Sequence, residues 1–256
     1  MVTHMYFQDK SDVRVSVFFP AKNEQGTIEN AILNAKESIY RPSSIVVIDA
    51  YSTDNTVELA KKAGAIVIEQ PKPIFPGKGL AMKTGIRECI SRSCDVIVFL
   101  DADIKNLTST WIDKLVSALV EGNYDMTRGF YQRQSRDAAV TKLIARPMLN
   151  IFFPEVSYFE QPLSGEVCAR TDTWQRLIDE QDCPDGWGID IWFLIEAAMF
   201  GYNIKEVFLG SKEHTSFEDY KEDVSKLSKM AEQVEITIIR EAIKHNRLDF
   251  QTSVPV

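Results

Sequence analysis

The alternation of short apolar strands with helical segments in the first hundred residues most constrains the fold of this chain. Short runs rich in valine, isoleucine and phenylalanine recur there, and three of the four are followed by a proline or an aspartate. Strands that are apolar on both sides are typical of parallel sheets covered by helices on both faces. We therefore expect an α/β fold whose first strands cover residues 13–19, 45–48, 65–68 and 95–100.

The remaining elements follow from apolar spacing. Helices are expected over 28–39, between the possible caps Ser52-Thr53-Asp54 and Gly64, and over 80–90. The less regular second half predicts strands over 126–131, 161–170 and 204–209, and helices over 141–152 and 189–200. The stretch 217–247 predicts a C-terminal helix whose narrow apolar stripe packs on the domain or on another subunit. That stripe consists of Tyr220, Val224, Leu227, Ala231, Val234 and Ile238.

Charge and composition exclude several classes of function. Lysines and arginines number 29 and acidic residues 37, which gives a net charge of −8. This balance argues against nucleic acid or an anionic membrane as the main partner. No apolar run is long enough to span a bilayer, so we expect no integral membrane segment. The histidines and cysteines show no zinc-ligand spacing, and reduced thiols in a cytoplasmic protein are the simplest interpretation.

Polar residues follow three of the expected strands. Residues 20–24, 49–54 and 101–103 should meet in one crevice, because parallel sheets bind ligands at the carboxyl ends of their strands. Asp101 and Asp103 could together hold Mg²⁺ or Mn²⁺ and a diphosphate. Alternatively, these acids end a buried strand simply because the chain returns to water there. The chain contains neither GxGxxG nor GxxxxGK[ST], which argues against a dinucleotide enzyme and excludes a P-loop.

A glycine-flanked lysine is the next candidate. In Pro76-Gly77-Lys78-Gly79 a flexible backbone and a point charge suit a phosphate or a base edge. An ordinary surface turn is the alternative interpretation of the same four residues.

The ordered set of motifs resembles a known family. Residues 19–24, 47–56, 77–79 and 99–103 look like the nucleotide-sugar half of GT-A glycosyltransferases, which have a Rossmann-like, mostly parallel sheet. Residues 128–133, 145–147, 161–166, 186–190 and 209–214 resemble the glucosyl-3-phosphoglycerate synthase and mannosyl-3-phosphoglycerate synthase-like enzymes. The resemblance implies one domain over 1–256, with a nucleotide-sugar half (13–125), an acceptor and metal half (126–216) and a C-terminal helix (217–247).

The resemblance also implies roles for residues in binding the donor and the metal. Asp101 and Asp103 would form the DXD metal motif around Mg²⁺ or Mn²⁺, with His214 as a distant third ligand. Lys212 would lie near the diphosphate, and Lys78 near the base or phosphates. The other residues implied to bind the nucleotide-sugar donor are Pro20, Ala21, Asn23, Glu24, Asp49 and Ala102.

The catalytic and acceptor residues depart more from the family pattern. Asp190 stands where the family has a glutamate near the reacting sugar; it could instead be an acid favoured at a helix N-terminus. The family's Gly-Arg-x-Thr is Ala138-Ala-Val-Thr141 here, so Ala139 replaces an arginine suited to phosphate. Nearby cations that could compensate are Arg128, Arg133, Arg136, Lys142 and Arg146. The expected acceptor site comprises Arg128, Thr141, Leu163, Ser164, Gly165 and Trp187, although Trp187 could equally be a core residue.

The resulting prediction is a retaining, metal-dependent, cytoplasmic hexosyltransferase. It would use a nucleotide sugar of the UDP-glucose or GDP-mannose type and a small anionic acceptor such as 3-phosphoglycerate or glycerate, and we expect a homodimer. One alternative is an inverting family-2-like transferase for a saccharide or lipid-linked acceptor, with Asp190 as general base. Another is a catalytically silent protein that binds nucleotide sugars.

Overall fold

A single sheet forms the centre of the molecule. The computed structural model describes residues 13–74, 77–132, 138–214 and 224–249. Within these residues the sheet has the order β3-β2-β1-β4-β6-β5-β7, in which β6 is antiparallel to β4 and β5 while the other pairs are parallel. This confirms the predicted mostly parallel α/β sheet. The strands are β1 (Val15–Ala21), β2 (Ser44–Asp49), β3 (Ile66–Glu69), β4 (Val96–Phe99), β5 (Met126–Gln132), β6 (Val167–Arg170) and β7 (Ile204–Ser211).

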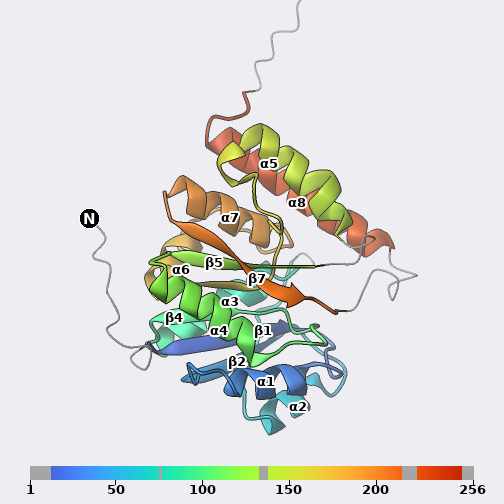
Figure 1. Cartoon of the computed structure of the whole chain (residues 1–256). Helices are drawn as coiled ribbons and strands as arrows, with labels where there is room; N and C mark the ends of the chain where they lie inside the picture. The colour runs from blue at the N-terminus through green and yellow to red at the C-terminus, as the bar shows by residue number, and fades with distance from the viewer. Residues whose placement is uncertain (1–12, 75–76, 133–137, 215–223, 250–256) are drawn as a thin grey trace, which may run out of the picture.

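Helices cover both faces of this sheet (Figure 1). Successive side chains of β1 point to opposite faces, so Val17 packs with one set of helices and Phe18 with the other. The first set is α1 (Ile28–Lys36), α2 (Thr56–Lys62) and α4 (Ser109–Glu121). The second set is α3 (Gly79–Ser91), α6 (Thr171–Ile178) and α7 (Ile189–Met199). None of the helices in the described residues is long and apolar enough to cross a membrane.

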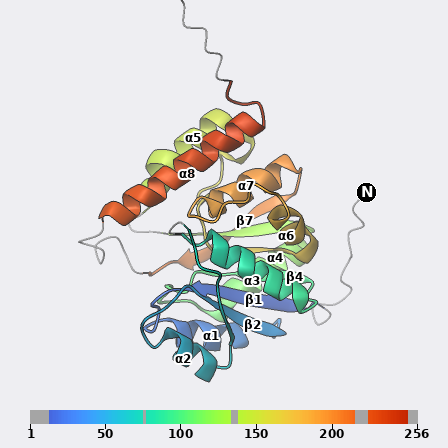
Figure 2. The same ribbon diagram turned by 180° about the vertical axis from the view of Figure 1, so that it is seen from behind.

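A third layer lies on α7. Figure 2 shows α5 (Arg146–Phe152) beside α8 (Val224–Lys244), beyond the layer that contains α7. Val234 and Ile238 of α8 are buried there, and Leu227 and Ala231 pack against the same cluster. These four residues of the predicted stripe therefore pack within the chain, whereas Tyr220 and the side chain of Val224 lie outside the described part.

Buried charges also connect α7 to α8. The carboxylate of Glu196 in α7 lies 2.5 Å from His245 Nε2 and 3.0 Å from Lys244 Nζ. Burial, with the neighbouring Glu196 carboxylate, raises the pKa of Glu241 to about 9. These contacts fix the C-terminal helix on the body of the protein.

Two predicted elements differ from the structure. The expected helix 141–152 begins as a π-helix, Thr141–Ala145, and becomes α-helical at Arg146; Pro147 cannot donate the backbone hydrogen bond of a continuous α-helix. Of the expected strand 161–170, only Val167–Arg170 pairs in the sheet. The preceding residues form a loop, in which Pro162 again lacks a backbone donor.

Candidate active site

The loops that follow β1 and β2 are joined by hydrogen bonds. The backbone N–H of Asn23 donates to Ser52 Oγ at 3.0 Å, and the Asn23 side-chain oxygen accepts from the Thr53 N–H at 2.8 Å. The Glu24 N–H donates to Thr56 Oγ1 at 2.8 Å. Asn23 has a φ of 59°, a left-handed conformation that asparagine tolerates better than most residues. Asn23 and Glu24, which were predicted to bind the donor, are thus held against the loop after β2.

Asp49 lies at the end of β2 and is 5% exposed. Its carboxylate oxygens each lie 3.2 Å from the Ser52 N–H, which donates to them and holds the turn after the strand. Pro20 and Ala21 end β1 directly beside β2, with Ala21 opposite Asp49 in the parallel register. The structure therefore brings together the nucleotide-binding candidates of the first two strands.

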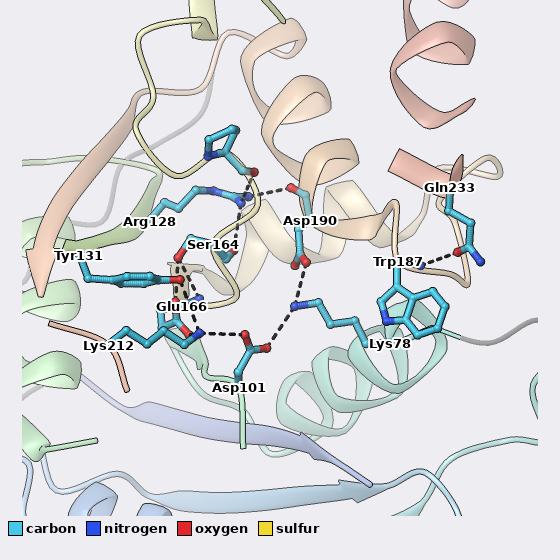
Figure 3. Close-up of polar contacts among 11 residues, drawn as sticks. Lys78, Asp101, Arg128, Tyr131, Ser164, Glu166, Trp187, Asp190, Lys212 and Gln233 are labelled. Atoms are coloured by element: carbon cyan, nitrogen blue, oxygen red, sulfur yellow. Dashed lines mark hydrogen bonds and ion pairs between the residues drawn. The ribbon is translucent and has the colours of Figure 1, made fainter. Parts of the chain in front are cut away.

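A chain of alternating charges crosses the centre of the site (Figure 3). Lys78 Nζ lies 2.8 Å from Asp190 Oδ2 and 3.1 Å from Asp101 Oδ1. Lys212 Nζ lies 3.2 Å from Asp101 Oδ2 and 2.7 Å from Glu166 Oε1. Four of these five residues were predicted as site residues from the sequence, whereas Glu166 was not. The pairs leave Asp101 between two lysines.

Burial and pairing shift the pKa values in this chain of charges. Burial opposes the charge on Lys78, but the carboxylates of Asp101 and Asp190 raise its pKa above the usual range. Burial also disfavours the Asp101 anion, yet Lys78 and Lys212 hold the pKa of Asp101 well below its usual range. For Asp190 burial prevails, and it raises the pKa to about 6 although Lys78 favours the anion. Of Asp101 and Asp190, Asp190 is therefore the more readily protonated.

Asp103, two residues after Asp101, forms a second pair with His214. An isolated antiparallel bridge joins Ile104 to His214 and places the two side chains together, with His214 Nδ1 3.7 Å from Asp103 Oδ2. Asp103 Oδ1 is buried and has no hydrogen-bond partner among the described residues. A buried carboxylate oxygen without a donor fits a metal ligand, and oxygen with imidazole nitrogen is a donor set that Mn²⁺ accepts. These residues therefore fit the metal that the DXD motif implies.

Arg128 does not face an acceptor as predicted. Its side chain is fully buried, and its guanidinium donates to the carbonyl oxygens of Pro162, Ser164 and Asp190 at 3.0–3.1 Å (Figure 3). Buried backbone carbonyls need hydrogen-bond donors, and the Arg128 guanidinium provides the donors for these three. The acceptor assignment of Arg128 is thus corrected to support of the backbone around the site.

The segment Leu163-Ser164-Gly165 lies directly against Asp101. A Cβ atom at Gly165 would collide with the Asp101 carboxylate, so only glycine allows this approach. Ser164 is buried and donates to Glu166 Oε2 at 2.9 Å. Glu166 is itself completely buried. It ends the motif 161–166 on which the family resemblance partly rests, and that motif was the signal that could have identified it.

A pocket with a volume of about 200 Å³ is lined by residues from the stretch 138–146 and by Glu160 and Gln161, which come shortly before Leu163. Thr141, which was predicted to bind the acceptor, lines the pocket together with two cations, Lys142 and Arg146. Arg146 Nη1 lies 3.0 Å from Glu160, which also lines the pocket. Arg133 and Arg136 lie outside the described residues.

The fold and the acidic site define a class of enzyme. A mostly parallel sheet carries two aspartates just after a central strand: Asp101 lies between two lysines, and Asp103 lies beside His214. This combination is that of a metal-dependent nucleotide-sugar glycosyltransferase of the GT-A fold.

Comparison with known proteins gives the family. The family model "Mannosylglycerate synthase, GT domain" matches residues 13–230, and the chain belongs to this family. It is 31% identical to the glucosyl-3-phosphoglycerate synthase of Petrotoga mobilis, over 96% of this chain and 79% of that protein. It is 28% identical to the mannosylglycerate synthase of Rhodothermus marinus, over 75% of this chain and 52% of that protein.

A solved structure agrees with these relatives. The glucosyl-3-phosphoglycerate synthase of Mycobacterium tuberculosis, in complex with Mn²⁺, UDP and phosphoglyceric acid, matches with a TM-score of 0.78 and 31% identity. The match covers 91% of this chain and 80% of that one. The predicted resemblance to a glucosyl-3-phosphoglycerate synthase-like glycosyltransferase is thereby confirmed.

Proposed function

We propose that this protein transfers a hexose from a nucleotide sugar to a small anionic acceptor, with Mg²⁺ or Mn²⁺ as cofactor and with retention at the anomeric carbon. The observation that carries the proposal is the meeting of Asp101, Asp103 and His214 with Lys78 and Lys212 at the strand ends. The donor would be of the UDP-glucose or GDP-mannose type, and the acceptor 3-phosphoglycerate or glycerate. Relatives support this choice, since structures of the Mycobacterium tuberculosis enzyme contain UDP-glucose with phosphoglyceric acid or glycerol 3-phosphate.

In this proposal the donor spans the strand ends. Pro20, Ala21, Asn23, Glu24 and Asp49 bind the nucleoside, supported by the hydrogen bonds between the loops after β1 and β2. The diphosphate lies at Asp101, Ala102 and Asp103, where Asp103 and His214, with Asp101, hold the metal.

The leaving diphosphate needs positive charge. The bound metal supplies a Lewis acid that neutralises the charge developing on the diphosphate. Lys78 and Lys212 already lie within 3.2 Å of Asp101, so both cations are fixed beside that position before the donor arrives. Charges that need no reorganisation during the reaction stabilise the transition state most effectively. Lys78 therefore acts on the departing group, and its other contact orients Asp190 toward the sugar.

Retention places the acceptor on the same face of the sugar as the leaving group. In this proposal the acceptor hydroxyl is steered by diphosphate oxygens and by the backbone of Leu163-Ser164-Gly165, which lies on Asp101. Trp187 stacks on the sugar or the acceptor. One observation favours the inverting alternative: Asp190 has a pKa of about 6, which suits a general base. Against it, Lys78 occupies one Asp190 oxygen at 2.8 Å.

The acceptor would bind in the pocket at Thr141. We expect Lys142→Ala or Arg146→Ala to raise the acceptor KM about tenfold or more while the donor KM stays nearly constant. A charge-assisted hydrogen bond to an anion contributes about 1.5–3 kcal/mol, and 1.4 kcal/mol corresponds to a tenfold change. Steady-state kinetics with each substrate varied in turn measures both constants. Lys205→Ala, at an exposed lysine of β7, is the matched control. Unchanged acceptor KM values in both variants would place the acceptor elsewhere.

A screen of donors and acceptors with product identification tests the function as a whole. UDP-glucose and GDP-mannose are each supplied with 3-phosphoglycerate, glycerate or a neutral oligosaccharide, with Mn²⁺ present. A glycosylated glycerate or phosphoglycerate is the expected product. Transfer to oligosaccharides with no response to either anion would overturn the acceptor assignment.

A homodimer and a cytoplasmic location complete the proposal. Large exposed apolar side chains around α5 support a dimer, since Leu143 is 76%, Ile151 68% and Tyr158 63% exposed. Light scattering should give twice the chain mass, and a monomer at micromolar concentration would contradict this part.

The cysteines support a reducing compartment because all four are free and buried, and burial raises the pKa of the Cys183 thiol to about 12.

A further inference from the structure

The C-terminal helix touches the glycine-rich loop before α7. Gln233 of α8 accepts a hydrogen bond from the Trp187 backbone N–H at 2.7 Å (Figure 3). A Cβ atom at Gly186 would collide with the Gln233 side-chain oxygen, and one at Gly188 with Thr237 Oγ1. Gln233 and Thr237 are four residues apart and so lie on the same face of the helix. The two glycines thus allow α8 to lie directly on this loop.

The same loop holds the start of α3. The carbonyl oxygens of Gly186 and Asp185 accept from the N–H groups of Gly79 and Leu80 at 3.1 and 3.0 Å. These donors belong to the first turn of α3 and have no partner inside the helix. Lys78 is the N-cap residue of α3, so the loop fixes the backbone at the lysine that pairs with Asp101.

Close packing reinforces these hydrogen bonds. A Cβ atom at Gly77 would lie 2.5 Å from the Gly186 backbone, and one at Gly79 would collide with the Pro184 carbonyl oxygen. Lys83 Nζ also donates to the Cys183 carbonyl at 2.9 Å. The glycines beside Lys78 therefore serve close backbone contact, in contrast to the flexibility expected from the sequence.

The loop also leads directly into α7. Asp190 comes two residues after Gly188 and is the partner of Lys78 at 2.8 Å. One short segment therefore sets the positions of both members of the Lys78–Asp190 pair, and α8 lies behind it. Gln233 and Thr237 follow residue 230, where the match to the family model ends.

From these contacts we propose that Gln233 is a positioning residue for glycosyl transfer, which acts through the Trp187 N–H to hold Lys78 and Asp190 in register. The proposal rests on the proposed function. A displacement of about 1 Å in a catalytic group can lower a rate about a hundredfold, so a contact that fixes the loop affects turnover without touching substrate.

The kinetic test compares two replacements of Gln233. Gln233→Met has a similar length but no acceptor for the Trp187 N–H, whereas Gln233→Glu keeps an acceptor oxygen. We expect Gln233→Met to lower kcat about tenfold with donor KM within about twofold, and Gln233→Glu to stay within about threefold of wild type. Glu235→Gln, on an exposed residue of α8, should leave both constants unchanged. Equal kcat values for wild type and Gln233→Met would overturn the proposal.

Tryptophan fluorescence provides a readout that does not depend on turnover. Trp111, Trp174 and Trp192 are at most 3% exposed, whereas Trp187 is partly exposed and should therefore dominate quenching by acrylamide. Gln233→Met should raise the quenching constant, and the increase should vanish in a Trp187→Phe background. If the wild-type chain transfers no sugar, the proposed function fails, but increased quenching still supports the role of Gln233 in holding the loop. Unchanged quenching in Gln233→Met would overturn that role, with or without activity.

Discussion

Asp103→Ala and His214→Ala should each lower metal-dependent turnover by about a thousandfold while the protein stays folded. A metal that neutralises a leaving diphosphate contributes several kcal/mol, which corresponds to about this factor. The Asp103 and His214 side chains are 25% and 18% exposed, so neither fills the apolar core. The loss should therefore appear in metal affinity and kcat, with Tm nearly unchanged.

Binding of Mn²⁺, followed by electron paramagnetic resonance, and turnover in EDTA measure these effects. Glu58→Ala, at an exposed acid of α2, serves as the control for loss of a negative charge. Full activity in EDTA would exclude the metal assignment. Near-normal rates in both variants would exclude these two residues as its ligands.

Lys78→Ala should lower kcat about a hundredfold. Its ammonium contacts Asp101 and Asp190 at once, so its loss removes a fixed cation from the diphosphate and leaves the two carboxylates without the charge between them. Removal of one preorganised group that stabilises transition-state charge typically costs a factor of about 10²–10³. Donor KM should change less than kcat, because the interaction strengthens as the diphosphate departs.

Steady-state kinetics at saturating Mn²⁺ checks this effect. Lys72→Ala removes an exposed lysine six residues before Lys78 and should leave kcat unchanged. A kcat for Lys78→Ala within threefold of wild type would show that Lys78 only supports the loop.

The sequence predicted those elements whose apolar pattern was uninterrupted. The strands that became β1, β2, β3 and β4 were placed to within two residues. Of these, β1, β2 and β4 are almost entirely buried, and strands covered by helices on both faces are rich in apolar residues. The helices α4 and α6 were not predicted, although Trp111, Leu115 and Leu119 show the helical spacing in α4. The segment 161–166 was wrongly predicted as part of a strand. Its polar side chains Ser164 and Glu166 bond to each other and to Lys212, and the Glu166 carbonyl accepts from the Gly129 N–H of β5.

The site was predicted only where a motif marked it. Asp101, Asp103 and Lys78 stand in short local patterns, and the structure pairs Asp101 with Lys78 and Asp103 with His214. The contacts of Glu166, Gln233 and Arg128 join segments far apart in the chain; Trp187 and Gln233, for example, are 46 positions apart. No spacing rule predicts such contacts, since tertiary packing alone determines them.

The anomeric configuration of the product tests the central claim most directly. The protein is incubated with UDP-glucose or GDP-mannose, Mn²⁺, and 3-phosphoglycerate or glycerate, and proton NMR follows the anomeric signal of the purified product. A glycoside of the anion with the same α configuration as the donor, formed only when metal is present, is the predicted result. A β-linked product would point instead to Asp190 as general base in an inverting reaction, and metal-dependent donor binding without any product would indicate a catalytically silent protein.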